Sequence, residues 1–280
     1  MDNHRPRPDP GSPSGAAYLF PRHPDEVNRL DLQHFALREA LGRNFLAPVE
    51  APGRVLDVGT GTGQWGFEVC HRFPDALVVG FDLVPGKPDH PPGYRHVRGN
   101  LLQGLPFQDD VFDFVHQRFL TWGVPVAAWP GVVVELVRVT RPGGWIELVE
   151  ITARPQRTGP ATQALFDLIH RHLAGPLGLD TTDVVFHSLD EYLRRAGLEE
   201  IVRREIALPL GEWGGQVGSL LATDSRTAGQ RLCELLRARS PDQAEEAIQL
   251  LSRAMDELDQ HRTIFPVAVA YGRRPIRPRS

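Results

Sequence analysis

Cysteine and methionine are scarce in this chain of 280 residues, with two of each. Cys70 and Cys233 lack the spacing of metal ligands, so we expect two buried thiols and no metal site. No apolar run approaches the roughly 20 residues that a membrane-spanning helix needs. Residues 1–15 also lack the apolar stretch of a secretory signal. These absences predict a cytoplasmic protein that has no membrane partner.

Lysine is almost missing, since Lys87 stands alone among 31 basic residues. This skew towards arginine suggests a GC-rich genome, as in actinobacteria, rather than a functional demand. The net charge is −4 and both signs are interspersed, which argues against a nucleic-acid partner. The basic cluster at 273–279 is expected to be a solvated tail. Hydrophobic residues make up 41% of the chain, which is enough for a sizeable core.

A glycine-rich segment carries the strongest signal, Arg54-Val-Leu-Asp-Val-Gly-Thr-Gly-Thr-Gly-Gln-Trp-Gly66, and Val78-Val-Gly-Phe-Asp82 follows it. The pattern is typical of a buried strand, a tight turn, the start of a helix and a second buried strand that ends in an acid. Glycine lets the backbone turn sharply and approach a ligand closely. An acid about 20 residues beyond such a turn suits the two hydroxyls of a ribose. The segment therefore predicts an adenosine-containing cofactor.

The spacing of the glycines leaves two classes of cofactor open. Gly61, Gly63 and Gly66 fit the fingerprint of a nicotinamide dinucleotide site. Asp57, however, precedes the first glycine by two residues, where its carboxylate would repel a pyrophosphate. The same carboxylate would attract the ammonium group of a methionine moiety, directly or through water. Asp57 thus favours S-adenosylmethionine over a nicotinamide cofactor.

Hydrophobic periodicity predicts strands that alternate with helices along most of the chain. This alternation is typical of a parallel sheet with helices on both faces and ligands outside the carboxyl ends of its strands. Strands are expected at 54–58, 77–82, 95–98, 111–116, 145–151, 200–208 and 263–272. Helices are expected at 25–46, 64–72, 132–139, 161–175 and 188–197 and within 216–262.

These elements divide the chain into seven segments. The ends and insertions are expected to surround one cofactor-binding core, and residues 1–15 have the composition of a disordered tail. The segments are 1–15, a tail; 16–50, a helical lid; 51–151, the Rossmann-like core; 152–187, a cap segment; 188–210, a core helix and strand; 211–262, a helical insertion; and 263–280, the last core strand with a basic tail.

Four motifs together resemble class I S-adenosylmethionine-dependent methyltransferases of the ubiquinone-biosynthesis and secondary-metabolism type. The motifs are Val55-Leu-Asp-Val-Gly-Thr-Gly-Thr-Gly63, Val79-Gly-Phe-Asp-Leu83, Leu105-Pro-Phe-Gln-Asp-Asp-Val-Phe-Asp113 and Arg141-Pro-Gly-Gly-Trp145. The segments Tyr18-Leu-Phe-Pro21 and Arg29-Leu-Asp-Leu-Gln-His34 are similar to relatives of fungal secondary-metabolite regulators and to actinobacterial natural-product methyltransferases. A teleocidin-type C-methyltransferase is one candidate. The resemblance implies an α/β, Rossmann-like sheet of seven strands, mostly parallel with the last strand antiparallel.

The resemblance also implies cofactor-binding residues, which would follow the ends of the first four strands. Asn100 stands where family members often carry Asp, and its carbonyl oxygen still accepts a bond from the adenine amino group. The implied contacts are Asp57, Gly59, Thr60, Gly61 and Gly63 for the methionine part; Asp82 for the ribose; Leu83, Asn100 and Leu101 for the adenine; His116 and Gln117 for the sulfonium end; and Tyr18 as a lid over the cofactor.

The acceptor side is less well defined by the sequence. His116 is the best-placed candidate for a general base, and a histidine bonded to the backbone is the alternative. Phe119, Trp122, Phe166 and His170 are expected to line a substrate pocket, which would suit an apolar or aromatic small molecule. The helical insertion would cover this pocket or make the contacts of a homo-oligomer. Other functions left open are a cofactor-binding regulator, a protein or RNA methyltransferase, and a nicotinamide enzyme.

Overall fold

Seven strands form one sheet in the order β3-β2-β1-β4-β5-β7-β6 in the computed structural model, which describes residues 24–276. The strands β1 to β5 are parallel, and β7 is antiparallel to both of its neighbours. The predicted mixed sheet with an antiparallel last strand is therefore confirmed. The strands are β1 Arg54–Val58, β2 Leu77–Asp82, β3 Tyr94–Arg98, β4 Phe112–Arg118, β5 Thr140–Ile151, β6 Glu199–Pro209 and β7 Ile264–Arg273.

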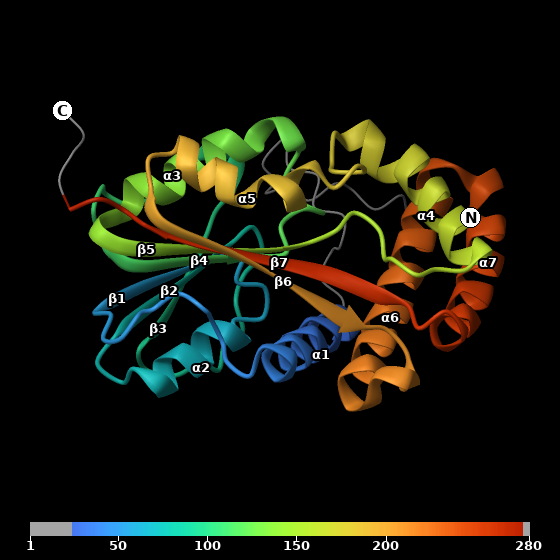
Figure 1. Ribbon diagram of the computed structural model, residues 1–280, viewed down its shortest axis with the longest axis horizontal. Coiled ribbons are helices and arrows are strands. Elements are labelled where there is room, and N and C mark those ends of the chain that lie inside the picture. Colours follow the sequence, from blue (N-terminus) through green and yellow to red (C-terminus); the bar gives the residue numbers. More distant parts are fainter. Residues whose placement is uncertain (1–23, 277–280) are drawn as a thin grey trace, which may run out of the picture.

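Helices cover both faces of this sheet and also extend beyond one end of it (Figure 1). One face carries α3 and α5, and the other carries α1 and α2. The central strands are buried on both sides, which is why β1 and β2 read as almost continuous apolar runs. The helices are α1 Pro24–Leu41, α2 Gln64–Arg72, α3 Trp129–Val139, α4 Pro160–Ile169, α5 Val184–Arg195, α6 Gly215–Arg239 and α7 Pro241–Gln260.

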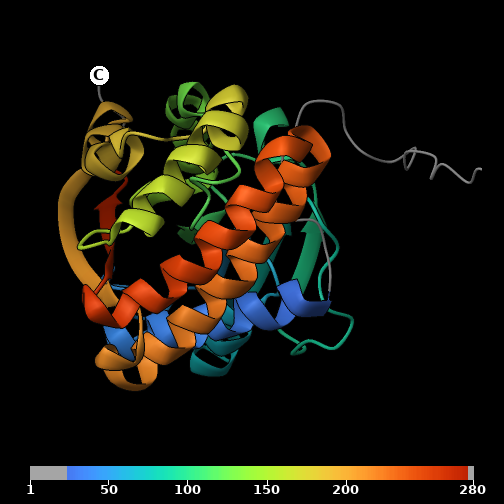
Figure 2. The same ribbon diagram turned by 90° about the vertical axis from the view of Figure 1, so that its right-hand side faces the viewer.

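Three helices form a cap that has its own hydrophobic core. Helices α6 and α7 run side by side as an antiparallel pair, with α4 next to α7 (Figure 2). Apolar residues at helical spacing pack between them, among them Leu165, Leu236 and Ala247. Helix α1 packs against α6, so the N-terminal helix and the predicted insertion meet over the sheet. No helix in the described part of the chain is long and apolar enough to cross a membrane.

Several predicted boundaries move. Helix α1 ends at Leu41 rather than at 46, because Gly42 has a positive φ of 66° and stops the helix. Helix α5 begins at Val184 rather than at 188. Its first turn is capped by Asp180, whose carboxylate accepts hydrogen bonds from the amides of Val184 and Val185. The predicted tail at 1–15 lies outside the described residues.

The order of the strands predicts a ligand site at the carboxyl ends of the central parallel strands. From β1 the chain builds outward to β2 and β3, then returns to pair β4 with the other side of β1. Ligands of open α/β sheets bind at this reversal of strand order, outside the carboxyl ends. The glycine-rich turn follows β1 directly and lies at this point.

Candidate cofactor and acceptor site

The glycine-rich turn has the backbone conformation that its sequence predicts. Gly59, Gly61 and Gly63 have φ values of 71°, 55° and 84°, in a region where a side chain is strained. The amides of Gly59 and Thr60 donate to the carbonyl of Phe81, at 2.8 and 3.2 Å, so the turn is attached to the end of β2. A Cβ at position 61 would lie 3.2 Å from Leu30 of α1. Glycine thus lets the turn pack closely against α1.

Asp82, the last residue of β2, faces this turn. Its Oδ2 accepts a hydrogen bond from the amide of Gly61 at 2.8 Å, and its Oδ1 accepts one from Val84 at 3.0 Å. Burial raises the pKa of Asp82, while these two backbone bonds oppose the shift. The carboxylate lines the cavity described below, as a ribose-binding acid would have to do.

Asp57 and His116 form a buried pair behind the turn. The carboxylate of Asp57 accepts from Thr60 Oγ1 at 2.6 Å and lies 2.9 Å from His116 Nδ1. The His116 ring stacks on Trp65 with centroids 3.9 Å apart and an interplanar angle of 5°. Burial lowers the pKa of His116, so the ring is neutral and donates from Nδ1 to Asp57.

Two residues predicted at the sulfonium end therefore do not line the cavity. His116 is occupied by Asp57 and Trp65, and Gln117 is buried with its Nε2 donating to Glu150 at 2.6 Å. The prediction of His116 as a general base gains no geometric support. Asp57 is only 3% exposed, so direct contact between its carboxylate and a cofactor would first require a change in this hydrogen-bonded pair.

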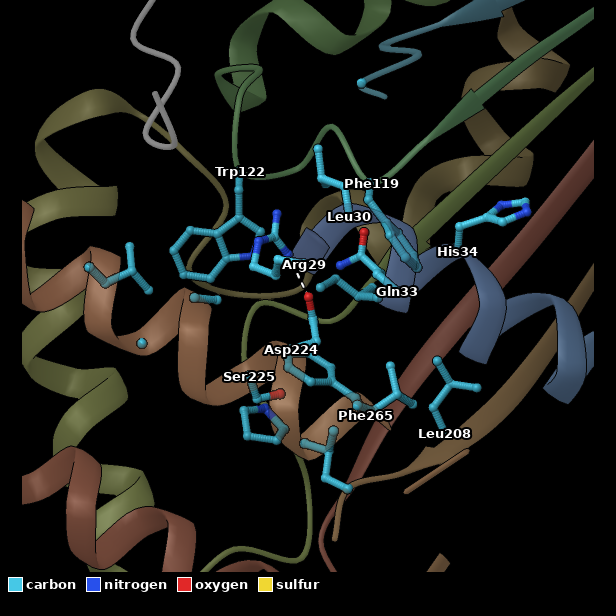
Figure 3. A pocket seen from close by; sticks show the side chains of 18 of the residues that line it. Arg29, Leu30, Gln33, His34, Phe119, Trp122, Leu208, Asp224, Ser225 and Phe265 are labelled. Atoms are coloured by element: carbon cyan, nitrogen blue, oxygen red, sulfur yellow. Dashed lines mark hydrogen bonds and ion pairs between the residues drawn. The ribbon is translucent and has the colours of Figure 1, made fainter. Parts of the chain in front are cut away.

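One cavity is lined both by the glycine turn at 59–62 and by the helices of the cap. Figure 3 shows the part of it around Arg29 and Asp224. Phe119, Trp122 and Phe166 line it, as predicted for the substrate pocket. His170 does not, because its ring lies between the carbonyl of Ala153, at 3.1 Å, and Arg154 Nη2, at 2.9 Å. The deep end is almost wholly apolar. Its walls come from α4, α6, α7 and β7 and include Leu165, Ile169, Leu232, Leu251, Ala254, Met255, Leu258 and Phe265.

The predicted adenine contacts Leu83, Asn100 and Leu101 are not among the residues that line this cavity, and they remain predictions. Asn100 caps the short helix Leu101–Gln103, with its Oδ1 accepting from the amide of Leu102 at 3.0 Å. Leu83 follows β2 and its carbonyl accepts from Arg98. Tyr18, the predicted lid residue, lies outside the described residues. Within residues 24–276 no group of His, Cys, Asp and Glu is arranged to hold a metal ion.

The most prominent cavity residues that the sequence did not reveal are a buried ion pair. Arg29 Nη1 of α1 lies 2.8 Å from Asp224 Oδ1 of α6, and the two side chains are 7% and 10% exposed. Figure 3 shows the pair between the apolar walls, next to Trp122. Arg29 belongs to a segment whose family likeness was visible. Nothing in the pattern of the helical insertion, however, distinguished Asp224 from its solvated neighbours.

Glu150 fixes the loop that follows β4. Its carboxylate accepts hydrogen bonds from Gln117 Nε2, from the amides of Leu120 and Thr121, and from Thr121 Oγ1. These bonds oppose the effect of burial, which raises the pKa of Glu150 to about 7. Because this loop presents Phe119 and Trp122 to the cavity, Glu150 holds one wall of the site in place.

Glu147 offers a test of a buried carboxylate. Burial raises its pKa from 4.5 to about 7, and its Oε2 accepts from the amides of Leu46 and Ala47, each at 2.7 Å. Between pH 4.5 and about 7 the folded chain binds more protons at Glu147 than the unfolded chain does. The free energy of unfolding therefore falls as the pH rises, by up to about 1.4 kcal/mol per pH unit. Glu147→Gln keeps an acceptor for both amides and should remove this slope.

Urea unfolding of wild type and Glu147→Gln at several pH values between 4.5 and 8 measures the effect. The exposed Glu50→Gln, in the same loop between α1 and β1 as Leu46 and Ala47, is the control and should leave the slope unchanged. Parallel stability curves for wild type and Glu147→Gln would contradict the raised pKa.

Comparison with known proteins places these features in a family. A family model described as a methyltransferase domain matches residues 31–201. The secondary metabolism regulator laeA of Aspergillus fumigatus is 31% identical over 203 residues, covering 70% of this chain and 54% of laeA. The N-methyltransferase sirN of Leptosphaeria maculans is 28% identical over 272 residues, covering 92% and 95%. The chain thus spans about half the length of laeA and nearly all of sirN.

Solved structures show the same fold at low identity. A methyltransferase from an antibiotic biosynthesis pathway of Anabaena variabilis superposes with a TM-score of 0.56 at 13% identity, covering 91% of this chain and 99% of that one. A Haemonchus contortus phosphoethanolamine N-methyltransferase 2, in complex with phosphomonomethylethanolamine and S-adenosylhomocysteine, has a TM-score of 0.51 at 14% identity, covering 91% and 62%.

The residues at the carboxyl ends of β1 and β2 fit the cofactor of such proteins. Asp82 can accept hydrogen bonds from a ribose, and the glycine turn lines the same cavity, where a ligand can approach its backbone closely. With a domain match over more than half of its length, the chain belongs to the methyltransferase domain family, and its cofactor is S-adenosylmethionine.

Proposed function

We propose that this chain transfers a methyl group from S-adenosylmethionine to a small, largely apolar or aromatic natural product. One observation carries the proposal: the cavity that begins at the glycine turn continues into an apolar chamber enclosed by α4, α6 and α7. A chamber of this kind is suited to a small molecule that becomes buried. A protein or RNA acceptor would favour an open, charged groove instead.

Methyl transfer from a sulfonium depends more on alignment of the acceptor with the methyl group than on activation of the donor. In an SN2 displacement the acceptor atom forms a bond to the methyl carbon while the carbon–sulfur bond breaks, and S-adenosylhomocysteine leaves. The donor is already activated, so the chain has to position the acceptor and exclude water. Trp122, Phe166 and Phe265 supply apolar faces for this purpose. A base is required only where the acceptor loses a proton, and C-, N- and O-methylation all fit the cavity.

A second candidate function is a regulator of secondary metabolism that binds the cofactor. The similarity to laeA favours it, since that protein is described as a secondary metabolism regulator and, in Emericella nidulans, as a protein-methionine methyltransferase. The enclosed apolar chamber argues for the small-molecule acceptor. A nicotinamide enzyme has no support from the family match.

Three finer expectations remain part of the proposal. They are a cytoplasmic location, assembly as a homo-oligomer and an actinobacterial pathway of the teleocidin type. The relatives named above are fungal, so they add nothing in favour of the last of these.

A direct assay separates the two candidate functions. The chain is incubated with methyl-labelled donor and an extract of metabolites and proteins from the producing cells, and mass spectrometry identifies what gains the label. The proposal predicts a labelled small molecule of low polarity. Label found only in protein or RNA would contradict it, and binding of the cofactor with no labelled product would favour the regulator.

Filling the apolar chamber provides a second prediction. Ala228 lines the cavity from α6, so Ala228→Trp should crowd the acceptor and lower kcat/KM for it by about tenfold or more, as overpacking of 1–3 kcal/mol implies. Affinity for S-adenosylhomocysteine should stay within about threefold, because the cofactor binds at the other end. Thr223→Trp, on the exposed side of the same helix, is the matched control. Equal effects of both variants would overturn the assignment of the chamber.

A further inference from the structure

Arg118, the last residue of β4, places a guanidinium in the cavity wall beside the glycine turn. Its Nη2 lies 3.3 Å from His34 Nδ1, and its side chain passes over the ring of Phe119, 5.8 Å from the centroid. Within residues 24–276 no carboxylate lies within ion-pairing distance of it. A guanidinium carries five N–H donors, so most of them remain available to a ligand.

The other arginine of the cavity wall differs in this respect. Arg29 is paired with Asp224 at 2.8 Å, deeper under the cap. Burial lowers the pKa of Arg118, and the more distant carboxylates of Asp57, Glu68 and Glu147 oppose this shift through their fields alone. Arg118 therefore stays charged at the cofactor end of the cavity, and the described residues leave its donors without an anion.

The order of the strands aligns Arg118 with the other cofactor residues. Strand β1 pairs with β2 on one side and with β4 on the other (Figure 1). Asp82 ends β2, the glycine turn follows β1, and Arg118 ends β4. The ends of β2 and β4 are two strand spacings apart, about 10 Å across the sheet. A ligand with its ribose at Asp82 and its chain over the turn extends towards Arg118.

His34 of α1 also lines the cavity and contacts the Arg118 guanidinium. Its ring is 1% exposed, and burial together with the charge of Arg118 lowers its pKa to about 4. The neutral ring accepts an Arg118 N–H at Nδ1, and its own proton is then on Nε2, which lies 3.3 Å from Glu68 Oε1. Glu68 of α2 is held in turn by Arg38 at 2.8 Å. The orientation of Arg118 thus depends on α1 and α2.

We propose that Arg118 binds the carboxylate of the methionine moiety of S-adenosylmethionine, and that His34 is the residue that positions it. A planar guanidinium matches a carboxylate with two parallel N–H···O bonds. The assignment gives the carboxylate of the cofactor a cationic contact at one end and places its ribose at Asp82 at the other. It rests on the cofactor of the proposed function but not on the nature of the acceptor.

Calorimetric titration of the whole chain with two ligands tests the assignment. One ligand is S-adenosylhomocysteine, and the other is its decarboxylated analogue, which keeps the amine. Arg118→Met should weaken binding of the first by about 10- to 100-fold, the value of a charged hydrogen-bond pair, and of the second by less than about threefold. Arg118→Lys should recover part of the loss, because it restores the charge but not the fork.

Controls separate this role from a loss of folding. Arg141→Met removes an exposed arginine that pairs with Asp113 and does not line the cavity, so it should change neither affinity. Equal losses for both ligands in Arg118→Met, or no loss for either, would overturn the role of Arg118. If the wild-type chain bound neither ligand, the cofactor itself would be wrong, which is a different failure.

The positioning role of His34 has its own readout. His34→Leu should weaken binding of S-adenosylhomocysteine by about tenfold, and His34→Asn should recover most of it, because the amide oxygen replaces Nδ1 as an acceptor. In an Arg118→Met background His34→Leu should have no further effect on this ligand. The same tenfold loss in both backgrounds would show that His34 does not act through Arg118.

Discussion

The Asp82→Ala variant is expected to bind S-adenosylhomocysteine about 100- to 1000-fold more weakly than the wild-type chain. Its carboxylate would accept two hydrogen bonds from the ribose hydroxyls, and bonds to a charged group contribute about 1.5–3 kcal/mol each. Two such bonds, even at the low end, amount to at least a hundredfold in affinity, since each tenfold corresponds to about 1.4 kcal/mol. No other cavity residue at the end of β2 offers a replacement acceptor.

The same carboxylate also holds the turn, which the experiment has to take into account. Asp82 accepts from the amides of Gly61 and Val84, so its loss alters the backbone as well as the ligand contact. Asp31→Ala is the matched control, because Asp31 binds Thr62 and Lys87 near the turn but does not line the cavity. Calorimetry should show little change for this control. If Asp82→Ala bound S-adenosylhomocysteine with wild-type affinity, the cofactor would not bind at the carboxyl end of β2.

A pH titration supports the same test. Burial raises the pKa of Asp82, so its carboxylate takes up a proton at a higher pH than an exposed acid would. Affinity for the cofactor should therefore fall as the pH is lowered through that raised pKa, because the protonated form accepts the ribose bonds less well. In Asp82→Asn this pH dependence should disappear.

The core of the site could be predicted closely from the sequence. Strand β1, helix α2 and strand β2 begin and end where the pattern places them, at 54–58, 64–72 and 77–82. The reason is local, since buried parallel strands are almost entirely apolar and the turn between them needs positive φ values that favour glycine. Because β1 and β2 are parallel neighbours, the acid that ends β2 lies opposite the turn that follows β1.

The fate of the polar residues behind the turn depends on contacts that are distant in sequence. Asp57 and His116 meet across 59 positions, and neither side chain of this buried pair lines the cavity. Arg118, two residues farther along the same face of β4, reaches the cavity instead. Period-two alternation predicts that these two residues share a face, but not which of them the helices bury.

The cap was predicted as helical and as a cover of the substrate pocket, with contacts of a homo-oligomer as the alternative, but the sequence did not show which of its side chains enclose the cavity. Its helices lie in two separate stretches of the chain, and only their packing encloses the apolar space. A helix with an apolar stripe has the same pattern whether it packs against a neighbour or lines a cavity. Phe119, Trp122 and Phe166 could be suggested because aromatic residues gather near the expected site, whereas Met255 and Phe265 gave no such signal.

Breaking the Arg29–Asp224 pair is expected to lower the unfolding free energy by about 3–5 kcal/mol, as removal of one partner of a buried pair does. Asp224→Leu leaves the Arg29 guanidinium in the apolar cavity without this carboxylate. The double variant Arg29→Met with Asp224→Leu removes both charges and should recover most of the loss. Urea unfolding of the two single variants and the double variant measures the coupling between the residues.

An exposed pair provides the comparison, because Asp190→Ala, which removes a partner of the exposed Arg194, should cost only about 0–1 kcal/mol. The buried pair joins α1, which carries His34, to α6, which covers the chamber. If the double variant folds well yet methylates poorly, the ion pair contributes to recognition of the acceptor. If it is as active as wild type, the pair acts only by joining α1 to the cap. Additive losses in the single and double variants would contradict the pairing itself.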